Sequence, residues 1–262
     1  MSVDTRRAQG SDSVRAAVVL VSAIVMLVGS FVGSGVVVGT PINEAAGGAL
    51  AADSTLVAPA GPAFSIWSVV YAGLLALAVY QLLPAQRRDA RQRRVGWWLA
   101  LSMLLNAAWI LTVQAGSVAG SLVVIAALLV VLVLTFGMLG GDRTGVPALQ
   151  RVLLDGTVGL YLGWVSVATV ANTAAFLVAD LGWSATGAVA VGWSLAVLVV
   201  VAGIAFLVGA GRRFAPALAI AWGLTWIAVG RLQGAPESVL TAVLALLVAV
   251  FALIAPVLRA RR

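Results

Sequence analysis

The chain contains no cysteine, no histidine and no lysine among its 262 residues. Without cysteine, neither a disulfide framework nor a thiolate metal site can form. Without histidine, the chain lacks the commonest general base, a frequent zinc ligand and the usual axial ligand of haem iron. Classical catalytic triads and zinc sites are therefore not expected.

Charged residues are scarce as well, at 10% of the chain, whereas hydrophobic residues make up 62% and the mean hydropathy is +1.10. A soluble domain of this size has too little interior to bury so much apolar surface. The composition therefore predicts an all-α integral membrane protein. Charges, prolines and glycine clusters divide the chain into eight apolar segments of roughly bilayer-spanning length, near 16–38, 63–83, 95–114, 118–139, 151–178, 186–209, 214–230 and 238–258.

All 16 basic residues are arginines, in short groups between the apolar segments. If the segments alternate in direction, only Arg231 falls on the side opposite to the others. The positive-inside rule then places both termini in the cytoplasm, in a cell (inner or plasma) membrane. Glu44, Asp53, Asp180 and Glu237 fall on the opposite side, which agrees with an even number of spans. Because the arginines form no continuous basic face, nucleic acid is not an expected partner despite the net charge of +7.

The N-terminus raises a second interpretation, because Arg6 and Arg7 before an apolar run are also typical of a secretory signal. The run from Ala16 to Val38 is longer than a usual signal core, and no small-residue cleavage site follows it directly. We therefore expect the first segment to remain a span, preceded by a cytoplasmic tail of residues 1–13.

Two asparagines lie inside predicted spans, Asn106 near the middle of the third and Asn172 in the outer half of the fifth. An amide without a partner in hydrocarbon costs several kcal/mol, so each side chain is expected to face a neighbouring helix or a cavity. The simplest account is a hydrogen bond between helices, worth about 0.6 kcal/mol on average. The neighbouring residues favour a second account.

Aromatic residues share helix faces with these asparagines, because positions three or four apart lie on the same side of a helix. Several of them fall at one depth, between the outer interface and the middle of the membrane. Such a set predicts a pocket for a flat, largely apolar ligand. Its predicted lining is Phe64, Trp67, Tyr71, Asn106, Trp109, Tyr161, Trp164, Ala168 and Asn172. By contrast, Trp97, Trp98 and Trp183 fit an interfacial aromatic belt.

Small residues at GxxxG spacing allow helices to approach closely. Within one polytopic chain such pairs more often serve internal packing than a homodimer, and both uses stay open. The pairs are Gly29 with Gly33, Gly35 with Gly39, and Gly159 with Gly163.

Arg151 and Asp155 lie four residues apart at the start of the fifth span, a spacing that predicts a local ion pair. No series of buried carboxylates or histidines continues inward from them to form a proton relay. The chain also has no Walker motif, dinucleotide fingerprint or paired catalytic carboxylates. Hydrolytic and phosphoryl-transfer chemistry are therefore not expected.

Three stretches resemble the tryptophan-rich sensory protein family, also called TspO/MBR or translocator protein. YLGWVSVATVAN (161–172) is similar to the family's fifth helix, whose motif reads roughly P-Y-x-x-W-V-S-F-A-T-x-L-N. PAFSIWSVVY (62–71) is similar to the second helix, and LNAAWILTVQ (105–114) carries the N-x-x-W of the third. The motifs occur in the family's order, and the resemblance covers about residues 14–180.

The chain also departs from the family pattern. Leu160 stands where the family usually has proline, and the spacing from Phe64 to Trp67 is one residue shorter than is common. The cholesterol-recognition pattern of animal members has no counterpart after Asn172, so sterol binding is not expected. Residues 181–262 would add three spans to the five-helix core expected in residues 14–180.

The resemblance implies a five-helix bundle that binds a tetrapyrrole such as protoporphyrin or haem, with residues 40–62 as a lid. It implies no required cofactor, and without histidine a haem would be held by stacking and shape. Our leading hypothesis is a membrane protein that binds a flat hydrophobic ligand for sensing or transport. Two alternatives stay open. One is a light- or oxidant-dependent tetrapyrrole-degrading enzyme that uses Trp67 and Trp164, and the other is a multispan scaffold whose polar residues serve packing only.

Overall fold

The computed structural model describes residues 10–33, 40–42, 44–140, 144–208 and 213–260. Every regular element in these residues is helical, and eight helices are long and apolar enough to cross a membrane, which confirms the predicted all-α membrane fold. The spanning elements are α1 (Gly10–Gly33), η2 with α2 (Gly61–Ser65 and Ile66–Tyr80), α4 (Ala90–Gln114), α5 (Val118–Met138), α6 with η3 and α7 (Ala148–Gln150, Arg151–Gly156 and Thr157–Ala179), α8 (Gly187–Val208), α9 (Phe214–Gln233) and α10 (Val239–Ala260). The short elements η1 (Ala45–Gly48) and α3 (Pro84–Arg87) lie in the connections. The predicted pair Gly35 with Gly39 lies outside the described residues, as do Arg6, Arg7, Arg143, Arg212, Arg261 and Arg262.

The first helix begins at Gly10, whereas the hydropathy pattern predicts its start near residue 16. The difference comes from two charged side chains that the helix buries. Arg15 donates to the Asp12 carboxylate at 2.9 Å, and Arg93 of α4 reaches the same carboxylate at 2.6 Å. Because these charges are paired, the helix continues through a stretch that hydropathy alone treats as a boundary.

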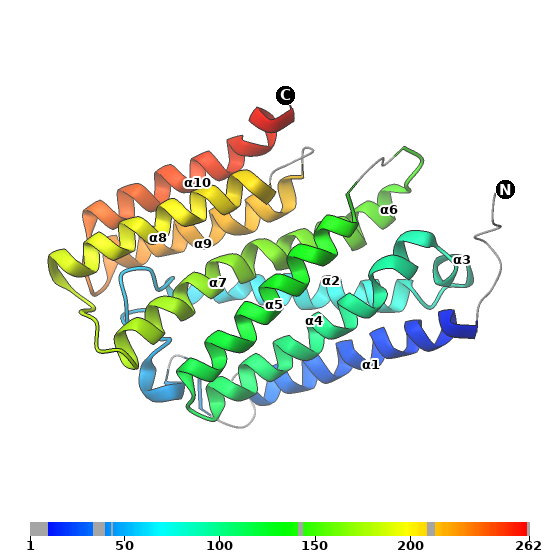
Figure 1. Ribbon diagram of the computed structural model, residues 1–262, viewed down its shortest axis with the longest axis horizontal. Coiled ribbons are helices and arrows are strands. Elements are labelled where there is room, and N and C mark those ends of the chain that lie inside the picture. The colour runs from blue at the N-terminus through cyan, green and yellow to red at the C-terminus, as the bar shows by residue number, and fades with distance from the viewer. Residues whose placement is uncertain (1–9, 34–39, 43, 141–143, 209–212, 261–262) are drawn as a thin grey trace.

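The helices pack as a bundle in which α1 contacts α4, α4 contacts α5, and α5 contacts α7. On the far side of α7 lies α9, which also packs against α10, and α10 in turn packs against α8 (Figure 1). One core of buried apolar residues fills the space among α1, α2, α4, α5 and α7, and a second fills the space among α7, α8, α9 and α10. The start of α1 and the end of α10 lie at the same end of the bundle, as an even number of spans requires (Figure 1).

Glycines allow close packing at two of these helix contacts. A Cβ added at Gly29 would lie 3.2 Å from the Ala107 side chain of α4. On α7, an added Cβ at Gly159 would lie 2.7 Å from the Ala215 side chain, and one at Gly163 would overlap the Pro216 carbonyl group. These glycine positions are therefore used for packing within the chain, and on α7 they leave room for the backbone of α9.

The arginines at the end where α1 begins bind backbone carbonyls as well as carboxylates. The last carbonyl groups of α5 accept from Arg91 at 3.4 Å (Leu139), Arg94 at 3.3 Å (Met138) and Arg213 at 2.7 Å (Phe136). Cations are favourable at a helix C-terminus because they satisfy its free carbonyls and complement its dipole. The arginine groups therefore hold three helices together at this end.

Asp155 pairs with a different arginine from the one that the sequence spacing predicts. Its two oxygens accept from the terminal nitrogens of Arg91 on α4, at 2.8 and 3.0 Å. A pair with Arg151 is not among the ion pairs of the described residues. The turn from Arg151 to Gly156 is a π-helix, in which hydrogen bonds join residues five apart, so the α-helical geometry assumed for this pair does not hold. Arg151 is exposed to its surroundings, whereas Asp155 is buried where Arg91 of α4 reaches it.

Candidate ligand pocket

Trp67 lies at the centre of an aromatic cluster from three helices. Its ring stacks on Tyr71 of the same helix with centroids 5.1 Å apart. It also lies 6.4 Å from Trp109 of α4, and it meets Tyr161 and Trp164 of α7 edge-to-face at 6.0 and 6.1 Å. These separations are those of favourable aromatic pairs. The three predicted stripes on α2, α4 and α7 thus converge on one side chain.

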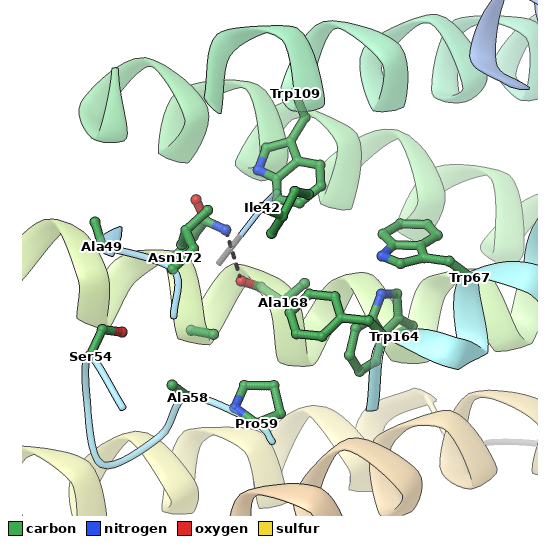
Figure 2. Close-up of a pocket in the computed structure, with 13 residues that line it drawn as sticks. Ile42, Ala49, Ser54, Ala58, Pro59, Trp67, Trp109, Trp164, Ala168 and Asn172 are labelled. Atoms are coloured by element: carbon green, nitrogen blue, oxygen red, sulfur yellow. Dashed lines mark hydrogen bonds between the residues drawn. The ribbon is translucent and has the colours of Figure 1, made fainter. Parts of the chain in front are cut away.

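Two neighbouring cavities border this cluster. The smaller encloses about 30 Å³, room for about one water molecule. Its lining consists of Ile42, Ala49, Leu50, Ser54, Ala58, Pro59, Phe64, Trp67, Trp109, Trp164, Ala168, Ala171 and Asn172 (Figure 2). The larger has about 450 Å³ and is lined by Ser30, Pro41, Ile42, Leu50, Ala52, Gly61, Phe64, Trp67, Ser68, Tyr71, Trp109 and Ile110. Both cavities share the wall made by Phe64, Trp67 and Trp109, so together they form one site.

The residues of the predicted lining occupy three kinds of position. Six of them line the smaller cavity: Phe64, Trp67, Trp109, Trp164, Ala168 and Asn172. Tyr71 lines the larger cavity. Asn106 and Tyr161 line neither cavity; both are fully buried behind the aromatic wall.

Tyr71 is fixed by a hydrogen-bonded series that joins three helices. Ser30 of α1 donates to the Tyr71 hydroxyl at 2.9 Å, and this hydroxyl donates to Asn106 Oδ1 of α4 at 3.0 Å. Asn106 therefore acts on the cavity indirectly, because it orients the ring that forms part of the wall.

Tyr161 supports the wall from behind. Its hydroxyl donates to the Ser102 carbonyl at 3.1 Å, and its ring meets the edge of Trp67. A fully buried hydroxyl needs such a partner. Tyr161 thus holds α7 against α4 and sets the position of Trp67.

Asn172 both lines the cavity and connects helices. Its Oδ1 accepts from the Ser121 hydroxyl of α5 at 2.8 Å, and its Nδ2 donates to the Ala168 carbonyl at 3.4 Å (Figure 2). The simple account of this residue, a hydrogen bond between helices, therefore holds together with its position in the cavity wall.

Two indole nitrogens in the cavity wall have no hydrogen-bond partner. Trp109 Nε1 and Trp164 Nε1 are both buried, and neither contacts an acceptor among the described residues. A buried donor without a partner costs about 1–3 kcal/mol. Both residues line the small cavity (Figure 2), so a ligand acceptor that reached their N–H groups would recover this cost.

The lid segment, residues 40–62 with residue 43 outside the described part, covers the cavities. Ser54, Ala58 and Pro59 lie across the small cavity from Trp109 (Figure 2). At the start of the segment, Gln114 of α4 donates to the carbonyls of Gly33 at 2.6 Å and Thr40 at 2.7 Å. The segment is thus tied to the ends of α1 and α4.

Ser30 and Ile110 are cavity residues that the sequence pattern did not single out. The only available signal for Ser30 was the Tyr71 hydroxyl, which needs a partner at that depth. Ile110 carried no signal, because one more isoleucine in an apolar span is indistinguishable from its neighbours.

Comparison with known protein families gives a match over most of the chain. Residues 17–256 match the family described as TSPO-like protein, and the matched region runs from α1 into α10. No curated protein and no solved structure matches the chain significantly. Since the match covers most of the sequence, the chain belongs to the TSPO-like protein family.

Proposed function

We propose that the protein binds a flat, largely apolar ligand of the tetrapyrrole class, such as protoporphyrin, in the cavities between α2, α4, α7 and the lid segment. The observation that carries this proposal is the pair of unpartnered indole N–H groups, Trp109 and Trp164, in an aromatic wall. Carboxylate or carbonyl oxygens on the ligand would accept from them. The stacked and edge-on rings around Trp67 offer π faces to a planar molecule.

The size of the site supports a ligand of this class. Small-molecule pockets usually have about 300–1,000 Å³, and the larger cavity already provides about 450 Å³. The smaller cavity extends it toward Trp164 and Asn172. A haem would have to be held by these rings and by shape, because the sequence has no histidine.

We propose sensing or transport as the use of this binding. Among the described residues, Tyr71 is the one titratable side chain in either cavity lining, and its hydroxyl is already hydrogen-bonded to Ser30 and Asn106. General acid–base catalysis requires a titratable group within reach of the reacting atoms. Such a lining therefore supports a binding role better than a hydrolytic one.

The test is a titration of protoporphyrin into the purified protein, followed by the porphyrin absorbance so that tryptophan substitutions do not alter the signal. Trp109→Phe and Trp164→Phe keep an aromatic ring but remove the N–H donor. We expect each to weaken binding by about tenfold, the effect of losing a hydrogen bond worth about 1–1.5 kcal/mol. Trp183→Phe is the matched control, because Trp183 lies exposed outside the cavity. Binding that is absent in the wild type, or equal in all variants, would refute the proposal.

The enzymatic alternative has one observation in its favour. Trp67 contacts Trp164 and Tyr71, so an electron vacancy formed at one ring has oxidisable neighbours within about 6 Å. If the protein degrades porphyrin under light and oxygen, the absorbance of the bound porphyrin should decay faster in the wild type than in the Trp67→Phe/Trp164→Phe double variant. Equal rates of decay in the two proteins would refute the enzymatic alternative.

A further inference from the structure

Arg231 is a buried arginine near the end of α9, with 1% of its surface exposed. Its Nη1 donates to the Thr55 carbonyl at 2.8 Å, and its Nη2 donates to the Ala52 carbonyl at 2.6 Å and to the Ala235 carbonyl at 3.2 Å. Two of these acceptors belong to the lid segment, which precedes Arg231 by more than 170 residues in the sequence.

Other contacts attach the same stretch of backbone to α9. The Ala60 amide donates to the Trp226 carbonyl at 3.2 Å. Just after the lid segment, the Ala63 carbonyl accepts from the Trp222 indole at 2.9 Å. The lid segment is therefore attached at its far end to α9, in addition to its attachment to Gln114 of α4.

The opposite side of this backbone forms the roof of the candidate pocket. Ser54, Ala58 and Pro59 line the small cavity, and Ala52, whose carbonyl accepts from Arg231, lines the large one. Since the small cavity has only about 30 Å³, a planar macrocycle enters it only if the roof moves away. The contacts that hold the roof thus oppose entry.

The chemistry of arginine suits this attachment. The planar guanidinium presents several donors in a fixed fork, so one side chain can bind two separate carbonyls at once. Among the described residues, no carboxylate lies within ion-pair distance of Arg231, so backbone carbonyls are its direct partners, while the Asp53 carboxylate of the lid segment attracts it through space. Its place in the last turn of α9 is also favourable for a cation. A lysine has a single nitrogen at its end, so it could not place two separate nitrogens on the Thr55 and Ala52 carbonyls as the guanidinium does.

We propose that Arg231 is a latch that holds the lid segment against α9, so that α9 controls access to the aromatic pocket. Arg231 is a positioning residue in this scheme: it acts through the backbone of residues 52–55 and does not touch the ligand. The latch itself stands on the contacts above, whereas its effect on access rests on the proposed ligand-binding function.

Hydrogen exchange tests the latch without any ligand. In Arg231→Gln we expect exchange of the backbone amides of residues 52–60 to rise by about tenfold, with an intermediate rise in Arg231→Lys. Amides of α4 and α7 should exchange as in the wild type, which shows that the bundle is intact. Gln233→Ala, an exposed change at the same end of α9, is the matched control. Exchange of residues 52–60 equal to wild type in Arg231→Gln would overturn the latch.

A disulfide tests access even if Arg231→Gln does not fold. An added Cβ at Gly230 would lie 3.6 Å from Ala60 Cβ, within the range for a disulfide, and the chain has no cysteine of its own. In oxidised Ala60→Cys/Gly230→Cys we expect protoporphyrin to associate at least about tenfold more slowly, with the rate restored by reductant. Ala60→Cys alone should not respond to reductant.

The outcomes separate the two proposals. Equal association rates in the oxidised and reduced double variant would overturn control of access by the lid. Absence of binding in both the wild type and the reduced variant would instead refute the ligand-binding function, while hydrogen exchange would still decide whether Arg231 holds the lid segment.

Discussion

The Tyr71 hydroxyl joins α1, α2 and α4, because it accepts from Ser30 and donates to Asn106. A hydroxyl that both accepts and donates a hydrogen bond fixes its ring in one orientation. The stack of Tyr71 on Trp67 is therefore in place before any ligand arrives, and a wall that is already ordered loses little entropy on binding.

A residue that lines a cavity can be predicted from helix spacing, whereas its partner on another helix often cannot. Trp164, Ala168 and Asn172 lie one turn apart, so their shared face follows from helix geometry. The contact of Ser30 depends on which helices α1 packs against. Asp12, Arg15, Ser22 and Ser30 mark the buried face of α1, but the sequence of α1 does not say which neighbouring side chain that face meets.

Asp155 offers a test of its pairing with Arg91. We expect Asp155→Asn to lower the free energy of unfolding by about 1–3 kcal/mol, because it leaves the partly buried Arg91 guanidinium without its carboxylate. Thermal unfolding in detergent measures this effect.

Arg151→Gln is the control for this prediction, since Arg151 is exposed and Asp155 binds Arg91. We expect Arg151→Gln to change stability by less than about 0.5 kcal/mol. Equal losses in the two variants would show that the local pair predicted from the spacing of Arg151 and Asp155 operates after all.

The helices themselves were the most predictable feature of the chain. Length and hydropathy predict all eight spans, because a bilayer requires about 20 apolar residues for each crossing. Two local features escaped this reasoning. The buried pairing of Asp12 extends α1, and the turn at Arg151–Gly156 is π-helical, contacts α2 and pairs with Arg91 of α4. A hydropathy profile contains none of these contacts.

The contact between α7 and α9 depends on Gly163. We expect Gly163→Ala to lower the free energy of unfolding by about 1–3 kcal/mol, because the added methyl group would overlap the backbone of Pro216 and force the helices apart. Thermal unfolding is again the measurement.

Gly203→Ala is the matched control, because a Cβ at Gly203 in α8 meets no other atom within 4 Å. Alanine favours a helix over glycine by about 1 kcal/mol, so this change should be neutral or stabilising. A loss of stability at Gly203 equal to that at Gly163 would show that helix packing is not the cause.

Orientation in the membrane remains a prediction for the molecule as a whole. Reporter fusions after Arg94 and after Arg262 should both report the cytoplasm, since arginine-rich connections stay on that side. A fusion after Asp180 should report the opposite side. A C-terminal reporter outside the cytoplasm would contradict the predicted orientation.

The division into a core of residues 14–180 and an extension of residues 181–262 also remains a prediction. The family match covers both parts, and the second apolar core includes Val167 and Ala174 of α7. The link between the lid segment and α9 could not be predicted from sequence, since a side chain such as Arg231 gives no indication of which distant carbonyls it will bind.

Arg231 lies far along the sequence from its acceptors, so the two are made at different times during synthesis of the chain. A ribosome makes Ala52 and Thr55 more than 170 residues before it makes Arg231. During that interval the roof of the pocket exists without its C-terminal attachment, while the motif-bearing helices α2, α4 and α7 are already complete. If Arg231 holds the roof as proposed, the newly made protein passes through a stage in which the roof lacks this attachment, and α9 supplies it only after the motif-bearing helices have been made.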